Sequence, residues 1–128
     1  MISLVLTTPA ECGARWDVLR IPAERGLPLF AWLTADDEDR RHIGPIAHSA
    51  RSGQTYWLIP IGTVHEVWPT DCRLLSTGCW VALPSIGLDA RSASWLHQPD
   101  DSTQLTGAVW LAAALGMLTA RTIPRGAR

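Results

Sequence analysis

The densest group of potential metal ligands in this chain is the run Asp36-Asp37-Glu38-Asp39, which Arg40 and Arg41 follow directly. Carboxylate oxygens are the ligands that hard cations such as Mg²⁺ and Ca²⁺ prefer, so one interpretation is a metal site. The other interpretation is a solvated loop, because carboxylates adjacent in sequence repel one another and point in different directions. We favour the loop and expect no metal ion there.

The thiols and imidazoles are not spaced as metal ligands either. The three cysteines form an odd set without a C-x-x-C pair, and the four histidines show no H-x-x-x-H or H-E-x-x-H arrangement. We therefore expect neither a structural zinc site nor a disulfide framework, and predict reduced thiols in a cytoplasmic protein. These residues are Cys12, Cys72, Cys79, His42, His48, His65 and His97.

The overall charge does not indicate a polyanion-binding protein. The 128 residues include 11 basic and 12 acidic ones, a net charge of -1, whereas domains that depend on phosphate contacts usually carry a basic excess. All the basic residues are arginine, and neither lysine nor asparagine occurs, as is typical of a GC-rich bacterial genome. The arginine bias alone therefore does not predict phosphate recognition.

Tryptophan dominates the aromatic residues, with seven copies beside one tyrosine and one phenylalanine. A domain of this size is not expected to bury all seven, since the indole N–H needs a partner when it is buried. An exposed tryptophan favours a protein interface or a platform on which bases stack. For any single tryptophan, core packing remains the default interpretation.

The succession of patterns predicts one α+β domain over residues 1–121, with a mainly antiparallel sheet and flanking helices, and a short basic tail over 122–128. Pro and Gly predict a turn at 8–13, and two hairpins are expected, turning at 51–53 and at 76–78. The expected strands are 2–6, 16–21, 44–48, 55–60, 74–75, 80–83 and 94–96, and the expected helices are 23–35 and 103–119.

The C-terminal helix is predicted to begin after the capping segment Asp100-Asp101-Ser102 and to be apolar on most of its surface. A helix of this kind is either deeply buried or pairs with another surface, so we expect a protein partner or a homodimer here. No signal peptide and no apolar run of membrane-spanning length is visible, so we expect no membrane contact. The interface candidates are Trp110, Leu111, Ala114, Met117 and Leu118.

Two segments resemble a known family. They are the hairpin Ser52-Gly53-Gln54-Thr55-Tyr56-Trp57 and the segment Gly78 to Ser85, with W-V-A-L-P-S and a later Ser94-Trp95. With the order of elements, they resemble the catalytic domain of bifunctional DNA primase–polymerases (prim-pol), of the archaeo-eukaryotic primase superfamily. The resemblance covers about residues 2–95 and implies a core related to RNA-recognition folds.

The resemblance also implies a metal site whose ligands this chain matches only in part. The family uses an acidic pair on one strand, a His after a Gly-rich turn and a further Asp, because nucleotidyl transfer needs divalent cations held by carboxylates. Asp17 matches the first acid, but Leu19 or Arg20 stands at its partner position. The His position falls on Thr55, and the last Asp falls near Arg73, with Asp71 as a substitute if the register slips.

Three functions follow as hypotheses. The favoured one is a non-catalytic prim-pol-like binding or regulatory protein that acts through protein contacts of the C-terminal helix and needs no cofactor. The second is a nucleic-acid or nucleotide binder associated with DNA replication, with arginines on phosphate and aromatics on bases at Arg51, Tyr56, Trp57 and Arg73. The third is an active primase or polymerase that would hold Mg²⁺ or Mn²⁺ with Asp17, Asp71 and His48.

Overall fold

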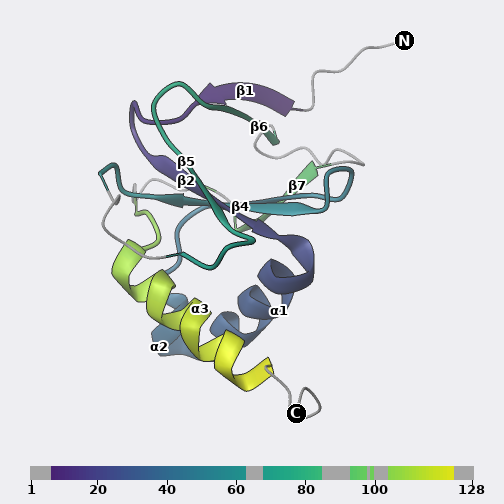
Figure 1. The fold of residues 1–128 in the computed structure, drawn as a ribbon, viewed down its shortest axis with the longest axis vertical. Helices are drawn as coiled ribbons and strands as arrows, with labels where there is room; N and C mark the ends of the chain where they lie inside the picture. The colour runs from purple at the N-terminus through teal and green to yellow at the C-terminus, as the bar shows by residue number, and fades with distance from the viewer. Residues whose placement is uncertain (1–6, 63–67, 85–92, 98, 100–103, 123–128) are drawn as a thin grey trace.

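The computed structural model describes residues 7–62, 68–84, 93–97, 99 and 104–122 (Figure 1). These residues form an α+β fold in which every strand pairing is antiparallel. The strands are β1 (Thr7–Glu11), β2 (Asp17–Pro22), β3 (Ile46–Ser49), β4 (Gln54–Ile59), β5 (Arg73–Leu75), β6 (Trp80–Pro84) and β7 (Ala93–His97). The helices are α1 (Ala23–Thr34), α2 (Asp37–Arg40) and α3 (Ala108–Thr122).

Five strands form one sheet in the order β5-β2-β4-β3-β7, and β1 pairs with β6 in a separate two-stranded ribbon. Figure 1 shows three layers, with the ribbon over one face of the sheet and the helices over the other. The sheet is therefore covered on both faces. This explains why β2 is buried at most of its positions rather than at every second one.

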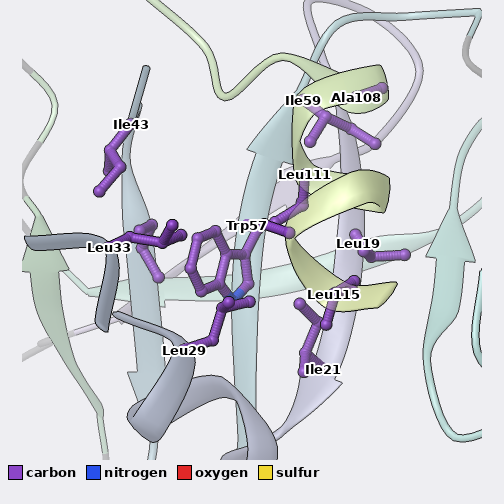
Figure 2. Packing of buried hydrophobic residues seen from close by; sticks show 12 residues of the cluster. Leu19, Ile21, Leu29, Leu33, Ile43, Trp57, Ile59, Ala108, Leu111 and Leu115 are labelled. Carbon is purple, nitrogen blue, oxygen red and sulfur yellow. The ribbon is translucent and has the colours of Figure 1, made fainter. Parts of the chain in front are cut away.

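The larger core lies between the sheet and the helices, and Trp57 of β4 is its largest fully buried side chain. Figure 2 shows its indole among Leu29 and Leu33 of α1 and Leu111 of α3. The indole nitrogen donates to Thr55 Oγ1 over 3.0 Å, so its polar group is satisfied inside the core.

Helix α1 approaches the sheet closely because Gly26 faces β4. A Cβ atom at Gly26 would stand 2.1 Å from Thr55 Oγ1, so only glycine fits at this contact. Pro28 lies inside the helix, beyond its first turn, where it removes one backbone hydrogen bond. The packing of Leu29 and Leu33 on the sheet compensates for that loss.

The smaller core lies between the other face of the sheet and the ribbon. Val81 and Leu83 of β6 pack there against Val18, Leu58 and Leu75 of the sheet. Two half-buried tryptophans, Trp16 and Trp95, border this cluster. The ribbon has only two strands, and it leaves other residues on this face partly exposed.

The expected turn at 8–13 is partly wrong, because Thr7–Glu11 is strand β1, paired with β6 from Thr7 opposite Pro84 to Glu11 opposite Trp80. Pro9 is tolerated because, within the described residues, β1 pairs with β6 on one side only. The expected strand at 2–6 and residues 123–128 of the expected tail lie outside the described residues.

The expected hairpin of 74–75 with 80–83 is wrong. Both segments are strands, but β5 pairs with β2 in the sheet and β6 pairs with β1 in the ribbon. The turn at Ser76-Thr77-Gly78 therefore carries the chain from one layer to the other. Periodicity identifies strands, whereas pairing depends on which partner buries more apolar surface.

The C-terminal helix begins at Ala108 rather than near Thr103, and the expected capping segment lies outside the described residues. Residues 104–107 instead run beside the end of β4, where the Thr106 backbone N–H donates to the Leu58 carbonyl over 3.0 Å. The Thr106 hydroxyl also accepts from the Gly44 N–H over 2.9 Å. These bonds hold the segment against the sheet before the helix starts.

The acidic run forms the short helix α2 rather than a loop. Asp36 caps it by accepting from the Glu38 N–H over 2.7 Å, and acidic side chains suit the positive end of a helix. Arg40 and Arg41 form exposed ion pairs with Asp37 and Glu38. Asp36, Asp37 and Glu38 are exposed and Asp39 is half-buried. No group of three or more His, Cys, Asp or Glu side chains placed to hold a metal ion occurs within the described residues.

Candidate functional site

Asp17, the first candidate acid, is a fully buried residue at the start of β2. Its Oδ1 accepts from the Ser76 hydroxyl over 3.0 Å, and its Oδ2 accepts from the Gly62 N–H over 3.1 Å. The carboxylate thus ties together the turns that follow β4 and β5. Both oxygens are used by protein donors, which is the arrangement of a structural carboxylate.

The other two candidates of the catalytic hypothesis lie away from Asp17. The β2–β5 register sets Arg73 opposite Arg20, so Asp71 lies toward the other end of β2, where it pairs with Arg25 over 3.2 Å. His48 on β3 lies opposite Thr55 of β4, and β4 separates β3 from β2. Asp17 on β2 lies opposite Ile59, which is four residues from Thr55 along β4. That offset is roughly 13 Å along the strands and 10 Å across them. The three side chains do not converge.

Two of the thiols are also unsuited to chemistry at neutral pH. Burial, together with the neighbouring Asp71 carboxylate, raises the pKa of the Cys72 thiol to about 12. Burial, followed by nearby Cys79, Asp17 and Glu11, raises the pKa of Cys12 to about 11. Since the thiolate is the reactive and metal-binding form, neither group is poised to be a nucleophile or a ligand.

Of the four nucleic-acid candidates, the prediction for Trp57 is wrong, because its indole is buried in the helix-side core and cannot stack on a base. Tyr56, its neighbour on β4, faces the opposite side of the sheet by strand alternation and is half-buried. Its hydroxyl lies 3.3 Å from the Ser52 hydroxyl. The β3–β4 turn that carries the exposed Arg51 is thereby linked to Tyr56.

Tyr56 and Arg73 are brought into one cross-strand row by a residue between them. Arg20 on β2 stands opposite Tyr56 on β4 and opposite Arg73 on β5. Residues directly opposite in a sheet share a face, so the three side chains rise from the ribbon side. We call Arg73, Arg20 and Tyr56 the arginine row.

The two guanidinium groups of this row form no ion pair with any described residue. Arg73 is exposed, and Arg20 is half-buried. The Nε atom of Arg20 is buried and has no hydrogen-bond partner in the part of the chain that the structure describes. Like charges directly opposite on neighbouring strands are unfavourable. An anion held between them would relieve the repulsion and satisfy their donors.

From the sequence, Arg20 is predicted only to replace the acid that the resemblance expects near Asp17. The signal for its role was present, since Arg20 is a cation within the apolar strand Asp17–Pro22. What was missing was the register that sets it between Tyr56 and Arg73.

The interface candidates on α3 divide between its buried and exposed sides. The prediction is wrong for Leu111 and Ala114, because both lie in the helix-side core and cannot contact a partner. Trp110 stacks on His42 with ring centroids 5.0 Å apart, and Leu118 is half-buried against the core. Met117 is 57% exposed, and Val109, which was not a candidate, is 70% exposed.

Comparisons with protein-family models, with curated proteins and with solved structures found no match for this chain. Among the described residues, no helix is both long and apolar enough to cross a membrane.

Proposed function

We propose that this chain is a non-catalytic binding protein on a prim-pol-like core, and that its arginine row binds the phosphates of single-stranded nucleic acid. The observation that carries the proposal is the cross-strand pair Arg20 and Arg73, two cations without an acidic partner among the described residues. Arg51, in the β3–β4 turn linked to Tyr56, supplies a third cation next to the Tyr56 end of the row.

The chemistry of the row suits a nucleic-acid strand better than a single inorganic ion. Guanidinium groups match phosphate oxygens with paired N–H donors. Tyr56 lies beside Arg20 and offers a ring on which a base can stack. RNA-recognition folds likewise stack bases on aromatic side chains of a sheet face, and here the ribbon leaves part of that face exposed.

The distribution of charge supports the same face, although the net charge of the chain is -1. The acidic cluster Asp36–Asp39 lies at α2, in the helix layer, whereas the arginine row faces the ribbon side. The sheet separates the two, so a phosphate strand on the ribbon side is kept away from the largest group of carboxylates.

The non-catalytic part of the proposal rests on Asp17. Its two oxygens accept from Ser76 and Gly62, and Asp71 is held by Arg25. Two metal ions in nucleotidyl transfer need several shared oxygen ligands at one place. The carboxylates of the prim-pol hypothesis are engaged elsewhere and apart from each other.

The proposal is tested by fluorescence anisotropy with labelled oligothymidylate. If three arginines contact phosphates, affinity should fall about tenfold between roughly 50 and 150 mM salt, since the slope is about 0.7 for each single-strand phosphate contact. Arg73→Gln and Arg20→Gln should each weaken binding and lower that slope. Arg41→Gln, an exposed arginine in the helix layer, is the matched control and should change neither.

Equal losses in Arg73→Gln and Arg41→Gln would mean diffuse attraction and would remove the arginine row as the site. Unchanged binding in Tyr56→Ala, with losses in the arginine variants, would leave the phosphate contacts and remove base stacking.

A second candidate function is favoured by the exposed side of α3. Val109 and Met117 are exposed there, with Ala113 and Gly116 between them on the same helical face. We propose a second copy of this chain as the partner. If the α3 helices of two copies cross antiparallel, Val109 of each copy lies against Met117 of the other, with the small residues between them at the crossing. Such a patch is self-complementary, as two-fold symmetry requires.

Sedimentation velocity tests this second candidate directly. The wild-type chain should associate with rising concentration, and Met117→Glu should stay monomeric. Glu24→Gln on α1 is a charge-changing control that should not alter association. A monomeric wild type at all concentrations would contradict the homodimer.

A further inference from the structure

We propose that the cavity beside the ribbon, bordered by Trp16 and Trp95, binds a small planar aromatic molecule that carries an anionic group. The cavity measures about 480 Å³, within the range of roughly 300–1,000 Å³ typical of small-molecule sites. None of the three residues of the arginine row lines it. The inference therefore goes beyond the proposed nucleic-acid function and does not depend on it.

Hydrogen bonds within the protein hold the walls of this cavity. The Trp95 indole nitrogen donates to the Pro84 carbonyl over 2.9 Å, which fixes the orientation of the ring. The Leu58 N–H donates to the Pro45 carbonyl, and the Leu58 carbonyl accepts from Thr106. These bonds join the floor of the cavity to the segment that carries Leu105. A preformed site loses less entropy when it binds.

The lining defines the chemical class of the ligand. Leu58, Leu83 and Leu105 form an apolar interior, and Pro45 and Pro99 add flat apolar surfaces. The two indoles offer faces against which a planar ring packs well. An aromatic ring is therefore a better fit than a polar sugar or a hydrated ion.

Arg15 is the reason for expecting an anionic group on the ligand. It is the charged residue among those that line the cavity, it is exposed, and it forms no ion pair with a described residue. Its guanidinium can pair with a carboxylate, sulfonate or phosphate at the mouth while the ring lies inside.

The test uses two dyes with the same aromatic skeleton, anionic anilinonaphthalene sulfonate and neutral phenylnaphthylamine. We expect one saturable site for each dye on the wild-type chain, followed by dye fluorescence. Arg15→Gln should weaken the anionic dye about fivefold, the size of one solvent-exposed charge contact. The same substitution should leave the neutral dye unchanged. An equal effect on both dyes, or none on either, would overturn the role of Arg15.

Two further variants locate the dye. Leu105→Trp should fill the cavity and weaken both dyes, provided that its thermal unfolding matches the wild type. Met117→Glu changes an exposed apolar surface elsewhere, on α3, and should leave both dyes bound. Loss of dye binding in Met117→Glu would assign the dye to α3 and overturn the cavity proposal. Displacement of the anionic dye by laurate but not by naphthalene sulfonate would overturn the aromatic class.

Discussion

The two faces of the five-stranded sheet differ in how completely they are covered. On the helix side, α1 and α3 bury Trp57 and a continuous set of aliphatic side chains, and Gly26 brings α1 into direct contact with β4. On the other side, a two-stranded ribbon covers part of the sheet and leaves the arginine row and a cavity of about 480 Å³. Both faces belong to the same strands, so the difference comes from what packs on them.

The comparison separates stability from binding. The helix-side core around Trp57 is closely packed, and a packed core is sensitive to any loss of volume. The ribbon side retains features that cost stability, namely two opposed cations and an Arg20 Nε that has no hydrogen-bond partner among the described residues. Features of that kind are common where a protein meets a ligand. Four measurements bear on this comparison.

Trp57→Ala should reduce the free energy of unfolding by about 3–5 kcal/mol, because it empties the centre of the helix-side core. Urea unfolding followed by circular dichroism measures the change. Trp80→Ala is the matched control, since this tryptophan is 61% exposed on the ribbon and should cost under about 0.5 kcal/mol. Similar losses for both variants would contradict the division.

Asp17→Ala should cost about 2 kcal/mol, because the Ser76 hydroxyl and the Gly62 N–H both lose their acceptor at a buried site. Asp37→Ala provides the control, since the Asp37 side chain is 88% exposed and its loss should hardly change the free energy of unfolding. An unchanged free energy of unfolding in Asp17→Ala would contradict the structural role of this carboxylate. It would then favour the catalytic hypothesis.

Alkaline pH should destabilise the fold through Cys12 and Cys72. Their folded pKa values, about 11 and 12, exceed the ordinary value of 9.0, so their contribution is complete below pH 9 and is lost as pH rises toward the folded values. Each thiol should lower the free energy of unfolding by up to about 1 kcal/mol per pH unit between its ordinary and its folded pKa.

Urea unfolding at several pH values measures this loss, and the absence of lysine leaves few other groups that titrate there. Cys72→Ala should lose less stability than the wild type between pH 9 and 12. A flat profile in the wild type would contradict the contribution of both thiols.

Arg73→Gln should raise the free energy of unfolding slightly, by up to about 0.5 kcal/mol, because it removes the like-charge pair with Arg20. Arg41→Gln removes a cation that faces Glu38 and should give no gain. Differential scanning calorimetry at low salt resolves the two variants. A clear loss in Arg73→Gln would indicate that the row stabilises the fold rather than serving a ligand.

Most elements were predictable because they depend on local pattern. The strand at 16–21, the helix at 23–35 and the hairpin around 51–53 closely match β2, α1 and the β3–β4 pair. The second hairpin failed because β5 and β6 join different sheets. Of the site, Tyr56 and Arg73 were proposed from residue type, whereas Arg20 needed the strand register.

The sequence by itself determined the α+β class, the antiparallel strands and the acidic character of the segment at 36–39, because periodicity and residue type act locally. Only the tertiary structure decided which residues are available for binding. Strand register brought Arg20 between Tyr56 and Arg73. Packing turned Trp57, Leu111 and Ala114 from surface candidates into core. Which face of a strand or helix is covered depends on segments distant in the chain, and alternation alone does not specify them.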